Sequence, residues 1–456
     1  MVAEIAAGRL GAREAFLASV ARIDATDGRI NAFTERQFAR GAAEAAEIDR
    51  RRARGETLPP LAGLPYAVKN LFDIAGAVTV AGSRIHREQP PATEDAVLVQ
   101  RLQAAGAVLL GALNMDEYAY GFTTENTHWG ACRNPHDLAR TAGGSSGGCG
   151  AAVAARQVPL SLGSDTNGSI RVPASLCGVW GLKPTFGRLS RRGSFPFVHD
   201  LDHLGPLADS VEGLALAYDA LQGPDPLDPG CQALRVQPAM PTLQQGAEGL
   251  RIGVLGGYFL QHADAAARAA VHAAARALGA SALVDWPEPT LARAAAFITT
   301  ASSGGSLHLE NLRRRSQDFE PLSVDRFLAG ALQPAAWLVR AQRFRRVYRA
   351  QVQALFADWD VLLAPATPVS APLLGTEWID IDGAPWPCRP SLGLLTQPVS
   401  YAGCPVVAAP LWPADNAGLP LGVQLIAAPW REDRALRAAW QLQQAGVAHC
   451  AVAEVP

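Results

Sequence analysis

Two segments rich in glycine and serine constrain this chain more than any other feature. The first is Gly143-Gly-Ser-Ser-Gly-Gly148, and the second is Gly163-Ser-Asp-Thr-Asn-Gly-Ser-Ile-Arg171. Residues 158–162, just before the second segment, form an apolar run that predicts a buried strand, and the small residues at 151–156 predict a short helix. Glycine and serine clusters between such runs form loops. The pattern therefore predicts strands joined to helices through two loops that are rich in hydroxyl groups.

The same alternation continues along the rest of the chain. Apolar periodicity predicts helices over 2–25, 35–54 and 95–105, and short apolar runs predict strands at 66–69, 107–110, 250–255, 361–365 and 422–427. Strands that alternate with helices indicate an α/β sandwich, with a mixed, mostly parallel central sheet flanked by helices. We expect one domain over residues 1–456. It has N-terminal helices at 1–55, a catalytic core at about 60–220, a helical lobe at about 260–360 and a C-terminal return to the sheet.

Composition and charge exclude several classes of function. The 40 basic and 42 acidic residues nearly balance, so no nucleic-acid surface is expected, and the arginines of 313–315 and 340–349 fit a solvated helix face. No apolar run is long enough to span a membrane, and the N-terminus lacks a secretion signal. The seven scattered cysteines predict free thiols in a reducing cytoplasm. Cys132 and Cys149 are predicted to be buried and inert.

The glycine-rich segments do not fit a nucleotide-binding site. A phosphate-binding P-loop needs Gly-Lys followed by Ser or Thr, and no Gly-Lys pair occurs in the chain. The dinucleotide fingerprint also requires a different glycine spacing after a strand. The loops are therefore better explained by their serines. A serine at a glycine-containing turn lies beside free backbone N–H groups, each of which stabilises a tetrahedral oxyanion by about 3 kcal/mol.

A nucleophilic serine needs a base, and the composition offers few candidates. Only two of the 40 basic residues are lysines, Lys69 and Lys183. A desolvated lysine can give up its proton, whereas arginine cannot. His199 and His203, four residues apart, could form a metal pair or part of a triad, but no further ligands with metal spacing follow. We therefore expect no metal and assign the histidines structural roles.

Taken together, these motifs resemble the signature of the amidase-signature family. The resemblance is carried by Lys69, by the two loops, by residues 178–188, Gly-Val-Trp-Gly-Leu-Lys-Pro-Thr-Phe-Gly-Arg, and by residues 360–368 and 418–426. It implies the amidase-signature α/β/α fold and a triad of serine, cis-serine and lysine. Ser169 matches the nucleophile, Ser145 the bridging serine after a cis peptide bond, and Lys69 the base.

The resemblance also assigns further residues. The oxyanion hole maps onto the backbone amides of Thr166, Asn167, Gly168 and Ser169, although family members usually have glycine at position 167. Lys183 matches a packing lysine. Ser146 and Gly144 fall beside the bridging serine and are expected at the substrate. Asp165 is expected to cap the turn. Relatives in the family use no metal or organic cofactor, so none is expected here.

The substrate is predicted from segments similar to the family members that hydrolyse glutamine for tRNA-dependent amide transfer. Those members hold the glutamine carboxylate with an arginine and its amine with an aspartate. Arg326 matches the arginine, but Gly393 stands in place of the aspartate. A bidentate arginine is a strong carboxylate clamp. The resemblance therefore implies a small ureide with a carboxylate and no α-amine, such as 1-carboxybiuret. It also implies a small helical accessory subunit of the C type, in a heteromer that could dimerise further.

Two alternatives stay open. One is a glutamine-hydrolysing subunit of a tRNA-dependent amidotransferase, which the missing aspartate at position 393 disfavours. The other is a catalytically inactive scaffold, which the intact Lys69, Ser145 and Ser169 disfavour.

Overall fold

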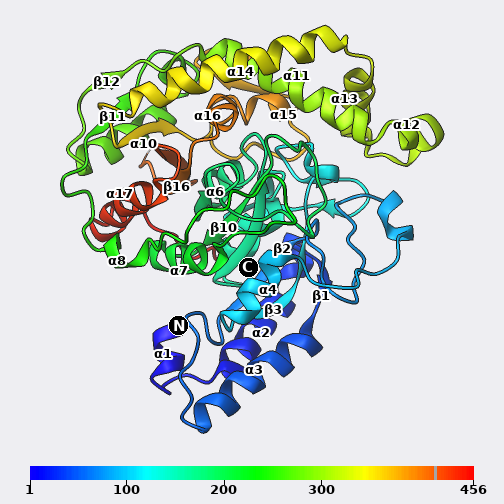
Figure 1. Cartoon of the computed structure of the whole chain (residues 1–456), viewed down its shortest axis with the longest axis vertical. Coiled ribbons are helices and arrows are strands. Elements are labelled where there is room, and N and C mark those ends of the chain that lie inside the picture. Colours follow the sequence, from blue (N-terminus) through cyan, green and yellow to red (C-terminus); the bar gives the residue numbers. More distant parts are fainter. Residues whose placement is uncertain (415–417, 456) are drawn as a thin grey trace.

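The computed structural model describes residues 1–414 and 418–455, and one sheet of eleven strands runs through its centre (Figure 1). In spatial order the strands are β1 (Phe33–Arg36), β3 (Val108–Leu113), β2 (Pro65–Lys69), β8 (Leu160–Asp165), β10 (His203–Ala208), β9 (Trp180–Lys183), β16 (Val406–Leu411), β17 (Leu421–Ala427), β13 (Val361–Pro365), β11 (Ile252–Leu255) and β12 (Leu283–Val284). Every residue of β2, β8, β13 and β17 is buried, so other elements cover both faces of these strands.

The sheet is mixed, as the sequence predicts. Parallel pairing occurs toward its two ends, where β2 lies between β3 and β8, and where β11 lies between β12 and β13. Every neighbouring pair from β8 to β13 is antiparallel, as is the edge pair β1 and β3. Antiparallel pairing is thus more extensive than expected from the sequence.

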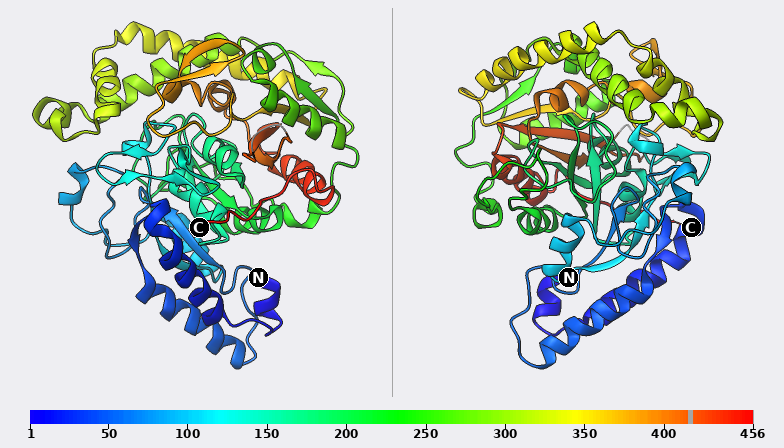
Figure 2. Two further views of the ribbon diagram at one scale, coloured as in Figure 1. Left: turned by 180° about the vertical axis from the view of Figure 1, so that it is seen from behind. Right: turned by 45° about the vertical axis from the view of Figure 1, so that its right-hand side comes forward.

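Helices surround the sheet and form a lobe at one end. Helix α11 packs against α13 and α14 at the top of Figure 1, and α2 and α3 lie at the opposite end of the molecule in both views of Figure 2. The helices are α1 (Val2–Ala6), α2 (Ala12–Ile30), α3 (Phe38–Ala53), α4 (Val97–Ala104), α5 (Gly147–Ala154), α6 (Arg171–Cys177), α7 (Val211–Leu221), α8 (Met240–Leu243), α9 (Tyr258–Gln261), α10 (Ala265–Ala277), α11 (Pro289–Leu307), α12 (Leu309–Arg315), α13 (Pro321–Ala331), α14 (Ala335–Leu355), α15 (Cys388–Ser391), α16 (Gln397–Ala402) and α17 (Glu432–Gln444). Because α10 packs on β13 and β17, it belongs with the sheet, and the helical lobe expected at about 260–360 begins at α11.

Short elements complete the described chain. Three two-stranded sheets join β4 (Glu125–Asn126) to β5 (Gly130–Ala131), β6 (Arg133–Asn134) to β7 (Asp137–Thr141), and β14 (Trp378–Ile381) to β15 (Ala384–Pro387). Single 3-10 turns are η1 (Ile85–Glu88), η2 (Glu117–Ala119) and η3 (Ser316–Asp318). No helix within residues 1–414 and 418–455 combines the length and the apolar character needed to cross a membrane.

The prediction of two long N-terminal helices is wrong in detail. The first is interrupted after Ala6, and α2 begins only at Ala12, where the Asp49 carboxylate accepts from the backbone N–H groups of Ala12 (2.9 Å) and Arg13 (3.0 Å). Helix α2 then ends at Ile30, its C-cap Asn31 has a left-handed conformation, and the chain enters the unpredicted edge strand β1. A capping contact from a distant residue, Asp49, thus supports the start of α2.

Three central strands and the start of α5 were also missed. Strands β9, β10 and β16 contain glycine or proline and show no clear apolar alternation. Residues 130–141, where no strand was predicted, contain β5, β6 and β7, and α5 starts within the first glycine-rich segment at Gly147. The glycine at 148 is needed for close packing, because a Cβ there would lie 2.6 Å from the backbone nitrogen of Asn114.

Candidate active site

The three residues predicted to form a triad come from three adjacent segments. Lys69 is the last residue of β2, and Ser169 lies in the turn after β8, the parallel neighbour of β2. The carboxyl ends of parallel strands share one edge of a sheet, so both residues lie at this edge. Ser145 lies just before α5, and the Gly144–Ser145 peptide bond is cis, as the family resemblance implies. The backbone N–H of Ser146 donates to the Ser169 carbonyl at 3.3 Å, which joins the two serine loops.

The surroundings of Lys69 favour its neutral form, which can accept a proton. Its Nζ donates to Ser145 Oγ at 2.6 Å and to Ser164 Oγ at 2.9 Å, and all of Lys69 is buried. Burial lowers the pKa of Lys69 to about 8, although the thiol of Cys149 and the carboxylates of Asp116 and Asp165 raise it. A neutral amine at Lys69 is therefore accessible near physiological pH.

Asp165 holds the turn that carries Ser169. Its carboxylate accepts from the backbone N–H groups of Gly168 (2.7 Å) and Ile170 (3.2 Å) and forms a buried ion pair with Arg171 at 2.9 Å. Burial alone would raise the pKa of Asp165, but the charge and hydrogen bonds of Arg171 hold it well below its usual range. Asp165 is thus the turn-capping carboxylate that the sequence predicts.

This arrangement corrects the predicted set of oxyanion donors. The amide of Gly168 is already engaged by Asp165, so it is not free for a substrate. In the described part of the chain, the backbone N–H groups of Thr166, Asn167 and Ser169 donate to no other group. The Thr166 side chain donates to Asp202 at 2.6 Å, which fixes this end of the turn. Three amides, and not four, remain for an oxyanion.

Ser169 and Arg326 line the same small cavity. Its volume is about 20 Å³, room for little more than one water molecule and far below the range for ligand pockets. The walls come from η2, the Ser169 turn, α11, α13 and α16, and the lining residues are Ala119, Tyr120, Gly121, Phe122, Thr166, Asn167, Ser169, Phe197, Phe297, Thr300, Arg326 and Gln397. The cavity therefore joins the candidate nucleophile to the predicted carboxylate clamp, and a ligand larger than a water molecule needs its lining side chains to move.

Arg326 is a cation without an ion-pair partner among the described residues. Its Nη2 donates to the Tyr120 carbonyl at 2.6 Å, and its guanidinium lies 4.3 Å from the centre of the Tyr120 ring. Burial lowers the pKa of Arg326, and Asp116, which opposes this shift, is itself paired with Arg389 at 3.5 Å. A cation of this kind is suited to binding the carboxylate of a ligand.

Phe122 accounts for the glycine at position 393. A Cβ on Gly393 would lie 2.5 Å from Cε2 of the Phe122 ring, so no side chain fits there in this structure. Phe122 also lines the cavity beside Ser169. The space in which the glutamine-hydrolysing relatives are expected to place an aspartate is thus filled by a phenylalanine.

Two residues expected at the substrate lie outside the cavity. The Ser146 hydroxyl is buried and forms hydrogen bonds with the backbone of Ser164, donating to its carbonyl at 3.1 Å and accepting from its N–H at 3.3 Å. Gly144 lies against Thr123, since a Cβ there would be 2.6 Å from the Thr123 nitrogen. Neither lines the space beside Ser169. The prediction that these two residues contact substrate is therefore not supported by the geometry.

The other residues considered as a base, metal ligand or nucleophile lie in surroundings that indicate structural roles. Lys183 is buried and donates to the Pro184 carbonyl at 3.0 Å, and burial lowers its pKa to about 7. His203 is buried, and its Nδ1 lies 2.6 Å from the Leu201 carbonyl oxygen. Burial raises the pKa of the Cys149 thiol to about 12, so it is a poor nucleophile. Within residues 1–414 and 418–455, no three His, Cys, Asp or Glu side chains cluster as metal ligands.

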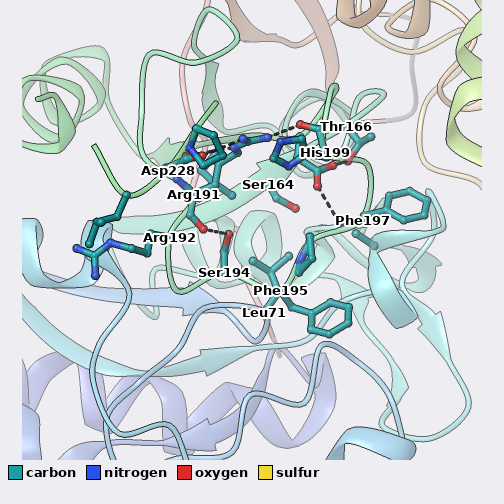
Figure 3. Close-up of a pocket in the computed structure, with 16 residues that line it drawn as sticks. Leu71, Ser164, Thr166, Arg191, Arg192, Ser194, Phe195, Phe197, His199 and Asp228 are labelled. Atoms are coloured by element: carbon teal, nitrogen blue, oxygen red, sulfur yellow. Dashed lines mark hydrogen bonds and ion pairs between the residues drawn. The ribbon is translucent and has the colours of Figure 1, made fainter. Parts of the chain in front are cut away.

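A second cavity adjoins the first and shares Ala119, Thr166 and Phe197 with it (Figure 3). Ser164 lies in its wall, and Ser164 Oγ also accepts from Lys69. Arg191 and Asp228, on the wall away from Phe197, form an ion pair at 3.0 Å. This cavity adjoins Lys69 through Ser164, whereas the first contains both Ser169 and Arg326, so the first is the candidate substrate site.

Sequence reasoning missed Phe122, Thr300, Gln397 and Ser164. Only Ser164 carried a usable signal, because it lies within the second glycine-rich segment and its neighbours were already assigned. The other three come from segments far from the signature and are brought to the cavity by the fold.

The chain resembles known proteins over almost its whole length. Residues 14–436 match the family model Amidase. The chain is 72% identical over 444 residues to AtzE, a component of the 1-carboxybiuret hydrolase of Pseudomonas sp. (strain ADP), with 97% of both chains covered. It is 39% identical over 473 residues to the A subunit of the glutamyl-tRNA(Gln) amidotransferase of Anaeromyxobacter sp. (strain K), with 97% of this chain and 94% of that one covered.

A solved structure is similarly close. It belongs to a vestigial protein complex that reveals the evolutionary origins of an s-triazine catabolic enzyme, and it superposes with a TM-score of 0.98 at 71% identity. The superposition covers 99% of this chain and 98% of the other.

Proposed function

The chain belongs to the amidase family and is an amide-bond hydrolase, and we propose that it releases ammonia from a small ureide with a carboxylate, such as 1-carboxybiuret. The observation that carries the proposal is the cavity that contains Ser169 together with Arg326, a cation with no ion-pair partner among the described residues. The 72% identity to a component of a 1-carboxybiuret hydrolase, over nearly the whole of both chains, supports the same substrate.

In the proposed acylation step, Lys69 acts as a neutral amine. It takes a proton from Ser145, and Ser145 takes the proton of Ser169 as its Oγ attacks the amide carbon. The negative charge on the former carbonyl oxygen is stabilised by the free amides of Thr166, Asn167 and Ser169. The proton returns through Ser145 to the amide nitrogen, the C–N bond breaks, and ammonia leaves an acyl group on Ser169.

In the proposed deacylation step, a water molecule takes the place of Ser169 as the nucleophile. A water molecule gives its proton through Ser145 to Lys69 and attacks the ester carbon of the acyl-Ser169. The bond from this carbon to Ser169 Oγ then breaks, and the serine recovers its proton. The net reaction adds one water across one C–N bond, so no oxidant, metal or organic cofactor takes part in the proposed mechanism.

Arg326 would fix the orientation of the substrate. Its guanidinium presents several N–H donors in a plane and would bind the carboxylate, leaving the amide carbon next to Ser169. Placing the reacting groups in this way supplies much of the rate enhancement of such enzymes.

Glutamine hydrolysis is the second candidate, because of the 39% identity to the A subunit of an amidotransferase. The Phe122 ring against Gly393 argues against it, since an α-ammonium group placed there would meet an aromatic ring. An inactive scaffold is disfavoured by the contact between Lys69 and Ser145.

We also propose that the chain works with a small helical accessory subunit of the C type in the cytoplasm. The solved structure at 71% identity comes from a protein complex, and all seven cysteines, which lie within the described residues, are free thiols. Size-exclusion chromatography with light scattering, on the chain co-expressed with its neighbouring genes, tests for this subunit.

The activity test measures ammonia release from freshly prepared 1-carboxybiuret and from glutamine by the purified chain with its accessory subunit. We expect turnover of the ureide to exceed that of glutamine by orders of magnitude. A preference for glutamine would move the amidotransferase function into first place.

A further inference from the structure

Asn167 carries an unsatisfied hydrogen-bond acceptor beside the candidate nucleophile. Its Oδ1 is buried and accepts no hydrogen bond from any residue in 1–414 and 418–455. Of the residues that line the cavity of Ser169, Asn167 is the one whose buried side-chain oxygen or nitrogen has no partner among the described residues. Leaving such a group unpaired is unfavourable, so a bound ligand with a donor at this place would gain affinity.

The rest of Asn167 is held rigidly. Its Nδ2 donates to Thr300 Oγ1 on α11 at 2.8 Å, and its backbone carbonyl accepts from Thr396 Oγ1 at 2.6 Å. Because the amide nitrogen is fixed by Thr300, the oxygen at the other end has a fixed direction. Asn167 Oδ1 is thus a preorganised acceptor.

We propose that Asn167 Oδ1 accepts a hydrogen bond from an internal N–H of the substrate and thereby selects ureides over simple carboxamides. This inference rests on the proposed function. The leaving nitrogen must face Ser145 and Lys69 to receive its proton. We place the acyl part of the substrate toward Arg326, in the cavity that Asn167 and Arg326 both line. A ureide has an N–H in this acyl part, whereas a carboxamide has a methylene group there.

A matched pair of substrates separates this contact from general packing. N-carbamoylglycine and succinamate both carry a terminal amide and a carboxylate, and they differ by one internal N–H in place of one methylene. Each is assayed with the wild-type chain and with Asn167→Leu, a variant of similar size that lacks the acceptor. We expect Asn167→Leu to lower kcat/KM for N-carbamoylglycine about tenfold more than for succinamate, the factor that corresponds to one hydrogen bond of about 1.4 kcal/mol.

Two further variants keep the test decisive if Asn167→Leu does not fold. Asn167→Asp retains an acceptor oxygen and should keep more of the preference for N-carbamoylglycine than Asn167→Leu does. Thr300→Val removes the anchor of the side chain and should weaken the same preference while leaving residue 167 unchanged. Equal losses on both substrates in all three variants would overturn the role of Asn167. If the wild-type chain hydrolyses neither compound nor 1-carboxybiuret, the proposed function itself fails.

Discussion

Lys69 Nζ lies 2.6 Å from Ser145 Oγ, and burial lowers the pKa of this lysine to about 8. The contact links the base to the bridging serine, and the lowered pKa makes the neutral amine available. Proton transfer in the proposed mechanism depends on this pair.

Removal of triad side chains should stop catalysis without unfolding the chain. Ser169→Ala and Lys69→Ala should each abolish ammonia release, and Ser145→Ala should reduce it severely, since each removes a group that bonds to or transfers a proton for the substrate. Intact mass after treatment with a fluorophosphonate should show one label, at Ser169. Cys149→Ala is the control and should still be labelled at Ser169. A label on Cys132 or Cys149, with activity lost in step, would contradict the assignment.

The rate should rise with pH because the base must be neutral. With a Lys69 pKa of about 8, kcat/KM should increase about tenfold per pH unit well below pH 8 and level off above it. The sign follows from the direction of the shift: protonated Lys69 predominates below its pKa and cannot accept a proton. Stopped ammonia assays from pH 6 to 9.5, on a substrate with no ionisation in this range, give the profile. A rate that falls between pH 6 and 8 contradicts the role of Lys69.

The ion pair of Asp165 with Arg171 should be essential for stability. Asp165→Asn leaves the buried Arg171 without its counter-charge, so the free energy of unfolding should fall by about 3–5 kcal/mol. The control is Asp24→Asn, which breaks the exposed pair with Arg36 and should change stability by less than about 1 kcal/mol. Denaturant unfolding of both variants measures the difference. Similar small losses would show that Arg171 finds another partner.

The sequence predicts a site residue when the residues that it contacts lie close to it along the chain. Lys69, Ser145 and Ser169 lie in short motifs, and the strand at 361–365 is bounded as predicted, because a continuous apolar run sets it. The Gly168 amide was misassigned because its engagement depends on the orientation of the Asp165 side chain, which sequence spacing does not specify. Phe122 was missed because only the fold brings it to Gly393, 271 positions along the chain.

Arg326 should discriminate acidic from neutral substrates. Arg326→Lys replaces a planar fork with a single ammonium, so kcat/KM for carboxylate-bearing ureides should fall by about 2–3 kcal/mol in transition-state stabilisation. Neutral amides of similar size should lose far less. Arg345→Lys is a matched control, because Arg345 also lies over a tyrosine ring, that of Tyr401 at 5.2 Å, and donates to the carbonyl of that tyrosine at 3.0 Å. An equal loss on acidic and neutral substrates would assign Arg326 to packing alone.

The contact of Phe122 with Gly393 makes a steric prediction. Gly393→Ala introduces a Cβ 2.5 Å from the ring and should destabilise the chain by about 1–3 kcal/mol through overpacking. Gly28→Ala is the comparison, because Gly28 lies in α2 with no atom within 4 Å of an added Cβ, and it should stabilise the helix slightly. Thermal unfolding of both variants measures these effects. A neutral Gly393→Ala would mean that the Phe122 ring moves away freely.

The contact of Phe122 with Gly393 also predicts that glutamine is a poor substrate. Glutaminase activity should then require substitutions at both Phe122 and Gly393. In the wild-type chain an α-ammonium group would enter the cavity without a carboxylate to pair with, which is unfavourable for a desolvated charge. Gly393→Asp alone should not help, because the ring of Phe122 fills the space of the new side chain. Phe122→Ala combined with Gly393→Asp provides both the space and the charge, so glutaminase activity should rise above that of either single variant. Robust glutaminase activity in the wild-type chain with its accessory subunit would show that the amine is bound elsewhere. If the double variant shows no gain in glutaminase activity, position 393 does not face the amine.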